Sequence, residues 1–325
     1  EDGDGTCSWQ AVAGGGGIGS FIDTSIAISS DGTALANDDG TANDNVGIGL
    51  NCLAAVTSGA GNVAIGDGAS TAGTTISGNV CVGQKAGRLH TGHGSVFIGK
   101  EAGETATSTS YSVGVGYRAL EGDVTTRLTG LYNIGIGSQA GKLISSGTDN
   151  IAIGREALLS NATTITGSYN TGIGYQSGYN LSTGQYNVLS GYQAGYGLTA
   201  GSYNLCLGWQ AGDSITSANY NICLGGKAGA GVVAGANNVL VGHESAKTYN
   251  FSNVTAVGFQ AGELNQGSDN VFVGYKAGRS ETASNKLHIA NNSTESLIEG
   301  DFSAKTVNIN GALTVNGAAV GGAME

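Results

Sequence analysis

A repeat of about 17 residues constrains this chain more than any other feature. Tyr203 to Gly212, reading Tyr-Asn-Leu-Cys-Leu-Gly-Trp-Gln-Ala-Gly, shows the unit. Numbered from a central glycine as position 0, the unit has Asn at −4, aliphatic residues at −3 and −1, Ala at +3 and usually Gly at +4. It occurs fourteen times, with central glycines at Gly49, Gly66, Gly83, Gly99, Gly116, Gly137, Gly154, Gly174, Gly191, Gly208, Gly225, Gly242, Gly258 and Gly274. A short fixed period indicates an array whose units each contact only their neighbours.

The apolar positions within each unit predict a short strand. Twelve of the fourteen −3 residues are Val, Ile or Leu, and thirteen of the −1 residues are aliphatic. Two such positions separated by one residue share a face of a strand. Glycine makes up 59 of the 325 residues and proline is absent, which suits closely spaced turns. We therefore predict an all-β fold, a parallel β-solenoid of about 14 coils with a 17-residue period, whose −3 and −1 side chains form the core.

The repeat divides the chain into three parts. Residues 45–278 are the predicted repeat array. Residues 1–44 lack the clear motif and are expected to be an N-terminal cap or linker, in which Ile26 to Ser29 could be a degenerate first coil. Residues 279–325 leave the repeat and are expected to form a C-terminal β cap or collar.

The middle strand residue, at −2, leads to a prediction of quaternary structure. None of its members is charged or strongly polar, and Phe97, Leu189, Leu240 and Phe272 are among them. A strand that is apolar on both faces is covered on both faces. Since one chain with this period can enclose only one face, we expect a homotrimer about a long axis, the simplest closed arrangement for a fibre. The alternative is that small −2 residues merely face water.

Asparagine at −4 recurs in eleven units. Asn tolerates left-handed backbone and bonds its local chain, so it could hold the turn that enters each strand. Stacked amides form a ladder, which Ser95, Ser112 and Val254 interrupt. The predicted structural ladder includes Asn133, Asn150, Asn170, Asn187, Asn204, Asn221 and Asn238.

Aromatic residues form columns that are the candidate binding residues. They occupy position +1 in Tyr175, Tyr192, Trp209, Phe259 and Tyr275, and position −5 in Tyr132, Tyr169, Tyr186, Tyr203 and Tyr220. Tyr179 and Tyr196 stand at +5, and glutamines recur at +2. These columns are either stabilising stacks or an amphipathic platform for a sugar face or a receptor loop.

The other residues point away from several function classes. The formal charge of −11 would repel a phosphate backbone, so nucleic acid is not an expected partner. No run of 18 apolar residues exists, so we expect no membrane insertion, and no leader segment is visible. Four of the five cysteines occupy small apolar positions of the repeat and are expected to be buried free thiols. Cys7 lies before the repeats.

No catalytic constellation, metal site or cofactor motif stands out in the sequence. His90 and His93 flank a short turn and could bind a metal, although a solvated loop is the preferred explanation. Paired carboxylates such as Asp38 and Asp39 lie outside the repeat. We therefore expect no enzymatic activity, no metal and no cofactor.

The units Asn62-Val63-Ala64-Ile65-Gly66, Asn150-Ile151-Ala152-Ile153-Gly154 and Asn270-Val271-Phe272-Val273-Gly274 resemble the head repeats of trimeric autotransporter adhesins and the shaft repeats of phage tail-fibre proteins. Both resemblances imply a homotrimer of left-handed parallel β-solenoids used for attachment. The stretch from Asn285 to Gly317 is similar to segments that precede the self-cleaving chaperone of tail-fibre proteins. The period is longer than that of the usual adhesin head, and no coiled-coil stalk is present, which favours the tail fibre.

The sequence thus predicts a non-enzymatic trimeric fibre shaft of an extracellular attachment structure. A phage tail fibre, exposed on the virion and presenting a surface for a host glycan or protein receptor, is the first reading. A bacterial cell-surface adhesin head is the second. A self-associating structural extracellular filament, from a different functional class, is the third.

Overall fold

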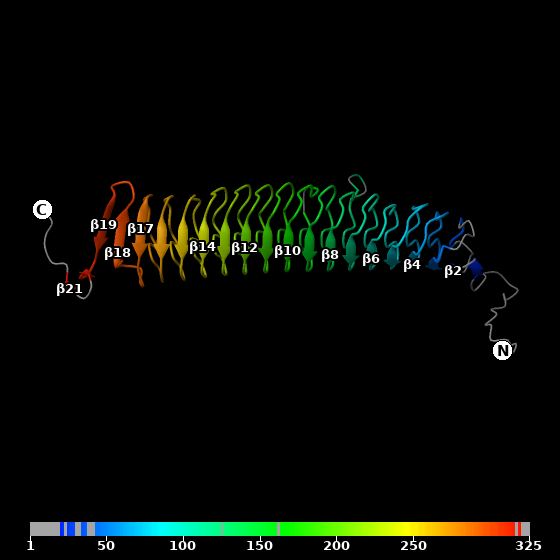
Figure 1. Ribbon diagram of the computed structural model, residues 1–325, viewed down its shortest axis with the longest axis horizontal. Coiled ribbons are helices and arrows are strands. Elements are labelled where there is room, and N and C mark those ends of the chain that lie inside the picture. The colour runs from blue at the N-terminus through cyan, green and yellow to red at the C-terminus, as the bar shows by residue number, and fades with distance from the viewer. Residues whose placement is uncertain are drawn as a thin grey trace, which may run out of the picture. The chain divides into compact units, whose positions relative to one another are not determined.

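The computed structural model describes residues 20–22, 25–29, 34–37, 43–123, 125, 127–160, 163–315 and 318–319. The chain forms two compact units, residues 1–173 (unit 1) and 174–325 (unit 2). Each is built from one short strand per coil, and successive strands pair in parallel and in register (Figure 1). The predicted all-β parallel solenoid is therefore confirmed, with about 15 turns. No helix in the described part of the chain is long and apolar enough to span a membrane.

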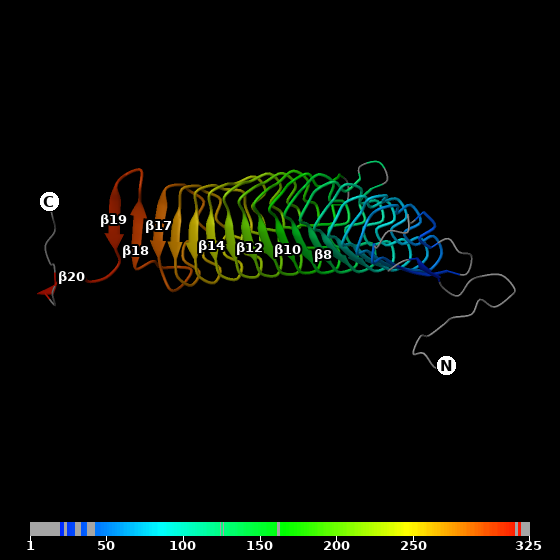
Figure 2. The same cartoon turned by 45° about the vertical axis from the view of Figure 1, so that its right-hand side comes forward.

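Unit 1 begins with an antiparallel pair and continues as a parallel stack. Strand β1 pairs with β2, and β2 places Ile26 beside Val46 of β3, so the expected degenerate first coil is present. The strands are β1 (Ser20–Ile22), β2 (Ser25–Ile28), β3 (Val46–Ile48), β4 (Val63–Ile65), β5 (Val80–Val82), β6 (Val96–Ile98), β7 (Val113–Val115), β8 (Ile134–Ile136), β9 (Ile151–Ile153) and β10 (Thr171–Ile173). Figure 2 shows that the chain returns from one strand to the next through turns.

Unit 2 continues the same pattern and ends in antiparallel strands. Its parallel stack runs from β11 to β17, and β18 and β19 then fold back against β17. The strands are β11 (Val188–Ser190), β12 (Leu205–Leu207), β13 (Ile222–Leu224), β14 (Val239–Val241), β15 (Thr255–Val257), β16 (Val271–Val273), β17 (Lys286–Ile289), β18 (Ile298–Asp301), β19 (Thr306–Ile309), β20 (Thr314–Val315) and β21 (Ala318–Ala319). Strands β20 and β21 form a separate hairpin.

The central glycines end the strands because no other residue fits there. Gly208 has a φ of 134°, and a Cβ added to it would lie 2.7 Å from the carbonyl carbon of Gly225 in the next coil. A Cβ added to Gly83 in unit 1 would likewise lie 2.6 Å from the carbonyl carbon of Gly99. Side-chain residues rarely adopt this backbone conformation, and the stacked coils leave no room for a side chain.

The core lies on the opposite face of the strands from the predicted one. The −2 residues, such as Ala64, Cys206 and Phe272, are fully buried inside one chain, whereas the −3 and −1 aliphatics are half-buried or exposed on the outside. The prediction that the −3 and −1 side chains form the core is therefore wrong. The same finding removes the argument that the −2 face needs a partner chain, because the chain encloses that face itself.

The size of the lumen explains this reversal. Each coil is slim, so its interior takes the −2 residue, the +3 alanine and one apolar residue from the returning turn, for example Cys206, Ala211 and Ile215. Small residues dominate at −2 and +3 because larger ones do not fit together. Where a large residue does occur, glycines make the space: a Cβ on Gly103 would lie 2.4 Å from the ring of Phe97.

Candidate functional site

The outward face of the strands, formed by the −3 and −1 side chains, is an apolar surface that repeats from coil to coil; we call it the strand face. In unit 1 it includes Ile98 at 39 % exposure, and in unit 2 it includes Leu207 at 37 %. Every strand from β2 to β9 carries two aliphatic residues at these positions. Such a continuous exposed apolar strip is characteristic of an interaction surface.

The −5 tyrosines stand beside the strand face and stack on one another. In unit 2 the ring centroids of Tyr186 and Tyr203 are 4.9 Å apart, and those of Tyr203 and Tyr220 are 5.1 Å apart, with interplanar angles of 11°. In unit 1 Tyr111 and Tyr132 stack at 5.5 Å. Since the ring faces cover each other, the column presents ring edges outward. Tyr169, at the same position in unit 1, is also exposed.

The +1 and +5 columns are less regular. In unit 2 Tyr175 and Tyr192 are tilted by 42° at 5.4 Å, whereas Tyr179 and Tyr196 are stacked at 5.1 Å. The ammonium of Lys227 lies 4.5 Å from the ring centre of Trp209, a cation–π contact. Phe259 stacks on Tyr275 at 5.6 Å, and both are exposed.

The +2 glutamines of unit 2 are joined by their amides. Gln193 donates to Oε1 of Gln176 at 2.9 Å, and Gln210 donates to Oε1 of Gln193 at 3.0 Å. In unit 1 several of the corresponding positions carry charges instead, although Gln139 also lies there. Arg118, for example, donates to Glu101 at 2.7 Å.

The predicted asparagine ladder is present and is buried. In unit 1 Asn150 donates to Asn133 and Asn170 donates to Asn150, each through its backbone N–H at 3.0 Å. In unit 2 Asn204, Asn221 and Asn238 each donate, through both backbone and side-chain N–H groups, to the Asn of the preceding coil, beginning at Asn187. The ladder therefore satisfies polar groups inside the solenoid.

Two details of the predicted ladder are wrong. Ser95 and Ser112 do not interrupt it, because the hydroxyl of Ser95 accepts from the N–H of Ser112 and that of Ser112 accepts from the N–H of Asn133. The left-handed backbone of the turn falls one residue earlier than the Asn, for example at Tyr203, with a φ of 60°. The Asn side chain fixes the turn by bonding across coils.

Three glutamates of unit 1 gather at one turn. Carboxylate oxygens of Glu101, Glu104 and Glu121 lie within 4.8 Å of one another, and oxygen donors suit a hard cation. Basic side chains already neutralise them: Arg88 lies 2.9 Å from Glu104, and Lys142 lies 3.6 Å from Glu121. Burial raises the pKa of Glu121, while the hydrogen bond from Arg118 lowers the pKa of Glu101. The cluster is an ion-pair network.

The histidines of unit 1 do not converge. His90 lies inside the solenoid, where its ring meets Phe97 edge-on at 5.2 Å and its Nε2 lies 3.3 Å from Oδ1 of Asn79. His93 instead accepts a hydrogen bond from the N–H of Ser77. Burial, with a smaller effect of His93, lowers the pKa of His90 to about 4. The expectation of a solvated loop is therefore wrong for His90.

The cysteines of the repeats are free and buried, as expected. Cys206 and Cys223 lie side by side in register on β12 and β13. Burial raises the pKa of Cys81 to about 12, so that thiol is inert near neutral pH. Cys7, Asp38 and Asp39 lie outside the described residues.

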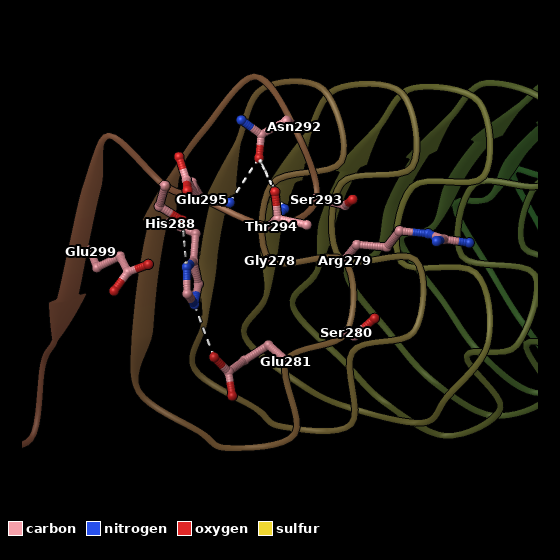
Figure 3. A pocket seen from close by; sticks show the side chains of 11 residues that line it. Gly278, Arg279, Ser280, Glu281, His288, Asn292, Ser293, Thr294, Glu295 and Glu299 are labelled. Atoms are coloured by element: carbon pink, nitrogen blue, oxygen red, sulfur yellow. Dashed lines mark hydrogen bonds and ion pairs between the residues drawn. The ribbon is translucent and has the colours of Figure 1, made fainter. Parts of the chain in front are cut away.

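A polar pocket of about 220 Å³ lies at the C-terminal end of the parallel stack in unit 2; we call it the terminal pocket (Figure 3). It is lined by residues 278–281, 292–296, His288 and Glu299. His288 is the −2 equivalent of β17, paired with Phe272, but no complete coil follows to enclose it. Its ring nitrogens instead contact Glu281 and Ser296, each at 2.9 Å. These three residues match no known spacing motif, so the sequence alone does not predict that they meet.

No protein-family model, no curated protein and no solved structure matches this chain.

Proposed function

We propose that the repeat array is the non-enzymatic shaft of an extracellular attachment fibre, assembled as a homotrimer. The observation that carries this proposal is the strand face. In both units it presents aliphatic side chains to solvent on an isolated chain, including Ile65 and Ile136 in unit 1 and Val257 and Val273 in unit 2. Covering these side chains is favourable by about 25 cal/mol per Å².

A second copy of the same chain is the occupant that fits best. The strand face repeats with the coil period, and another copy repeats with the same period, so every coil can make the same contact. A flat strip that lies along one side of a coil can be covered symmetrically by two neighbours around a threefold axis. The resemblance to trimeric fibre proteins supports the same arrangement. The proposed partners of each chain are therefore two further copies of the same chain.

The attachment role is proposed from the side chains that the array exposes. A stack of coils presents its side chains in columns, and the exposed tyrosines, Trp209 and the glutamine column offer groups suited to a host-surface glycan or protein receptor. A phage tail fibre on the virion surface is the proposed setting. The repeat columns on this surface carry aromatics and amides, which favours binding over hydrolysis by the array itself.

The mass of the native protein tests the trimer. We expect three times the chain mass of 32.1 kDa by light scattering or native mass spectrometry. Ile98→Lys and Leu207→Lys together place charge on the strand face and should release a folded monomer. Val233→Lys is the matched control, because Val233 is similarly exposed but lies outside the strands. A wild-type monomer would refute the proposal.

Binding to intact host cells tests the attachment role. Labelled protein should adsorb to a susceptible host, and Trp209→Ala with Tyr192→Ala should reduce adsorption while leaving the mass unchanged. Adsorption to bacterial surfaces or host tissue without any phage would favour the adhesin reading. End-to-end polymers of the purified protein in electron micrographs, without adsorption, would favour a structural filament.

A further inference from the structure

The terminal pocket contains a hydrogen-bonded chain of three side chains with the chemistry of an activated nucleophile. Ser296 Oγ lies 2.9 Å from His288 Nδ1, and His288 Nε2 lies 2.9 Å from Glu281 Oε2. Figure 3 shows the imidazole of His288 between the carboxylate of Glu281 and the turn that carries Thr294 and Glu295. All three residues belong to unit 2 and line, or lie at the edge of, the same pocket.

The protonation of this chain follows from Glu281. Its Oε1 accepts from the backbone N–H groups of Thr282 and Ala283, at 2.9 and 2.8 Å. Partial burial acts to raise the pKa of Glu281, but these N–H groups and the imidazole outweigh it and lower the pKa below its ordinary value. An ionised carboxylate only accepts hydrogen bonds, so in the neutral form of the His288 imidazole the proton lies on Nε2.

The tautomer in turn determines the role of Ser296. With the proton on Nε2, the Nδ1 atom has a free lone pair and accepts from the Ser296 hydroxyl. A serine hydroxyl that donates to an imidazole held by a carboxylate is the arrangement that activates serine for attack.

Backbone contacts hold Ser296 in place. Its carbonyl accepts from the Asn310 side chain at 2.8 Å, and the N–H of the next residue, Leu297, donates to Ile289 at 2.9 Å. The preceding turn is closed by Asn292, whose Oδ1 accepts from the N–H groups of Thr294 and Glu295. Ser296 is 6 % exposed, so the attacking atom sits in the pocket wall.

We propose that Ser296, His288 and Glu281 form a serine esterase centre. Ser296 Oγ attacks the ester carbonyl carbon as its proton passes to His288 Nδ1, and the imidazolium then protonates the departing alcohol. Water attacks the resulting acyl-serine as its proton passes to Nδ1, and the imidazolium returns that proton to Ser296 Oγ as the acid leaves. Ser296 and His288 are the catalytic residues, and Glu281 is a positioning residue that fixes the tautomer.

The pocket lining indicates the substrate class. Glu281, Glu295 and Glu299 line it, while the guanidinium of Arg279 is held by Glu263 at 2.7 Å. This surface disfavours anionic substrates, and about 220 Å³ accommodates a small acyl group on a neutral or cationic alcohol. The amides of Thr294 and Glu295 are already used by Asn292 and cannot both hold a tetrahedral oxyanion. Turnover is therefore expected to be slow, and the acylation step is the better measurement.

Covalent labelling of the assembled full-length protein tests the centre. A fluorophosphonate probe should modify Ser296, located by peptide mass spectrometry, and p-nitrophenyl acetate hydrolysis should disappear with Ser296→Ala. Ser303→Ala is the matched control, because Ser303 is an exposed serine of unit 2 that does not line the pocket. It should retain wild-type labelling and hydrolysis.

The positioning role of Glu281 has its own readout. Glu281→Gln keeps the shape but lets an amide donate to Nε2, which reverses the tautomer, so labelling should fall at least tenfold with an unchanged thermal midpoint. Glu281→Asp should recover part of the rate. Absence of a Ser296 adduct in a sample where a known serine hydrolase is fully labelled, or equal modification of Ser303, would overturn the proposal. A trimer without labelling would refute the esterase alone, and labelling of a monomer would refute the trimer alone.

Discussion

Units 1 and 2 use the same inward residues but different outward ones. Both have central glycines, stacked Asn side chains and alanines at +3. At +2 and +5, unit 1 carries ion pairs such as Arg118 with Glu101. The first coils of unit 2 instead carry the Gln176 to Gln210 amide row and the Tyr179–Tyr196 stack, and ion pairs such as Arg279 with Glu263 return in its last coils. The inward positions are fixed by close packing, and the outward positions are free to vary. Chemical differences between coils therefore mark where recognition can differ.

The largest effect should come from the position that both units share. Gly83→Ala in unit 1 and Gly208→Ala in unit 2 each combine backbone strain with a clash against the next coil, and each should cost about 4 kcal/mol. Thermal unfolding followed by circular dichroism measures this. Gly226→Ala is the control, since Gly226 has no positive φ and its nearest neighbour is the side chain of His243. A loss confined to one unit would break the similarity of the two interiors.

Lowering the pH should destabilise unit 1 more than unit 2, because the buried His90 belongs to unit 1. The pKa of His90 is lowered from 6.5 to about 4, so the unfolded chain takes up a proton that the folded chain excludes. Stability is then greatest above pH 6.5 and falls as the pH drops toward 4, by about 3 kcal/mol. Hydrogen exchange of residues 79–97 should accelerate over this range more than that of residues 204–222. His90→Leu should remove the difference, and an unchanged pH response in that variant would contradict the assignment.

The asparagine ladder allows smaller stability effects in the two units to be compared. Asn204→Ala leaves buried amide groups of neighbouring coils unpaired and should cost about 2 kcal/mol. Ser95→Ala in unit 1 removes two longer bonds, of 3.3 and 3.5 Å, and should cost about 1 kcal/mol. Chemical denaturation measures both, with the exposed Asn291→Ala expected to be neutral. Equal losses for Asn204 and Asn291 would show that the ladder contributes nothing to stability.

The smallest effect concerns the outward chemistry. Arg118→Gln should cost about 0.5 kcal/mol at low ionic strength, because the pair with Glu101 is partly exposed, and the loss should vanish in concentrated salt. Gln193→Ala in unit 2 should cost a similar amount at every salt concentration. Unfolding midpoints at two ionic strengths suffice to compare them. A salt-dependent loss in unit 2 would remove the distinction.

The period, the strands and the Asn ladder were predictable because each depends on local spacing. The strand face that points into the core was not predictable, because apolar residues occur on both faces, as in Leu205-Cys206-Leu207. The deciding signal is size: small residues predominate at both −2 and +3, and a narrow lumen favours them. The terminal pocket was not predictable either, because Glu281, His288 and Ser296 meet only through the β17–β18 connection.

The in-register pairing of neighbouring coils determines which changes in chain length the fold can accept. Val80 lies beside Val63, and Ile222 lies beside Leu205, so each coil offers its neighbour the same bonding edge that it receives. Removing or duplicating one whole repeat joins two compatible edges, while a partial repeat joins mismatched ones. The gene can therefore lengthen or shorten the protein in whole-coil steps and keep every remaining contact, which makes length an inheritable trait separate from the surface chemistry.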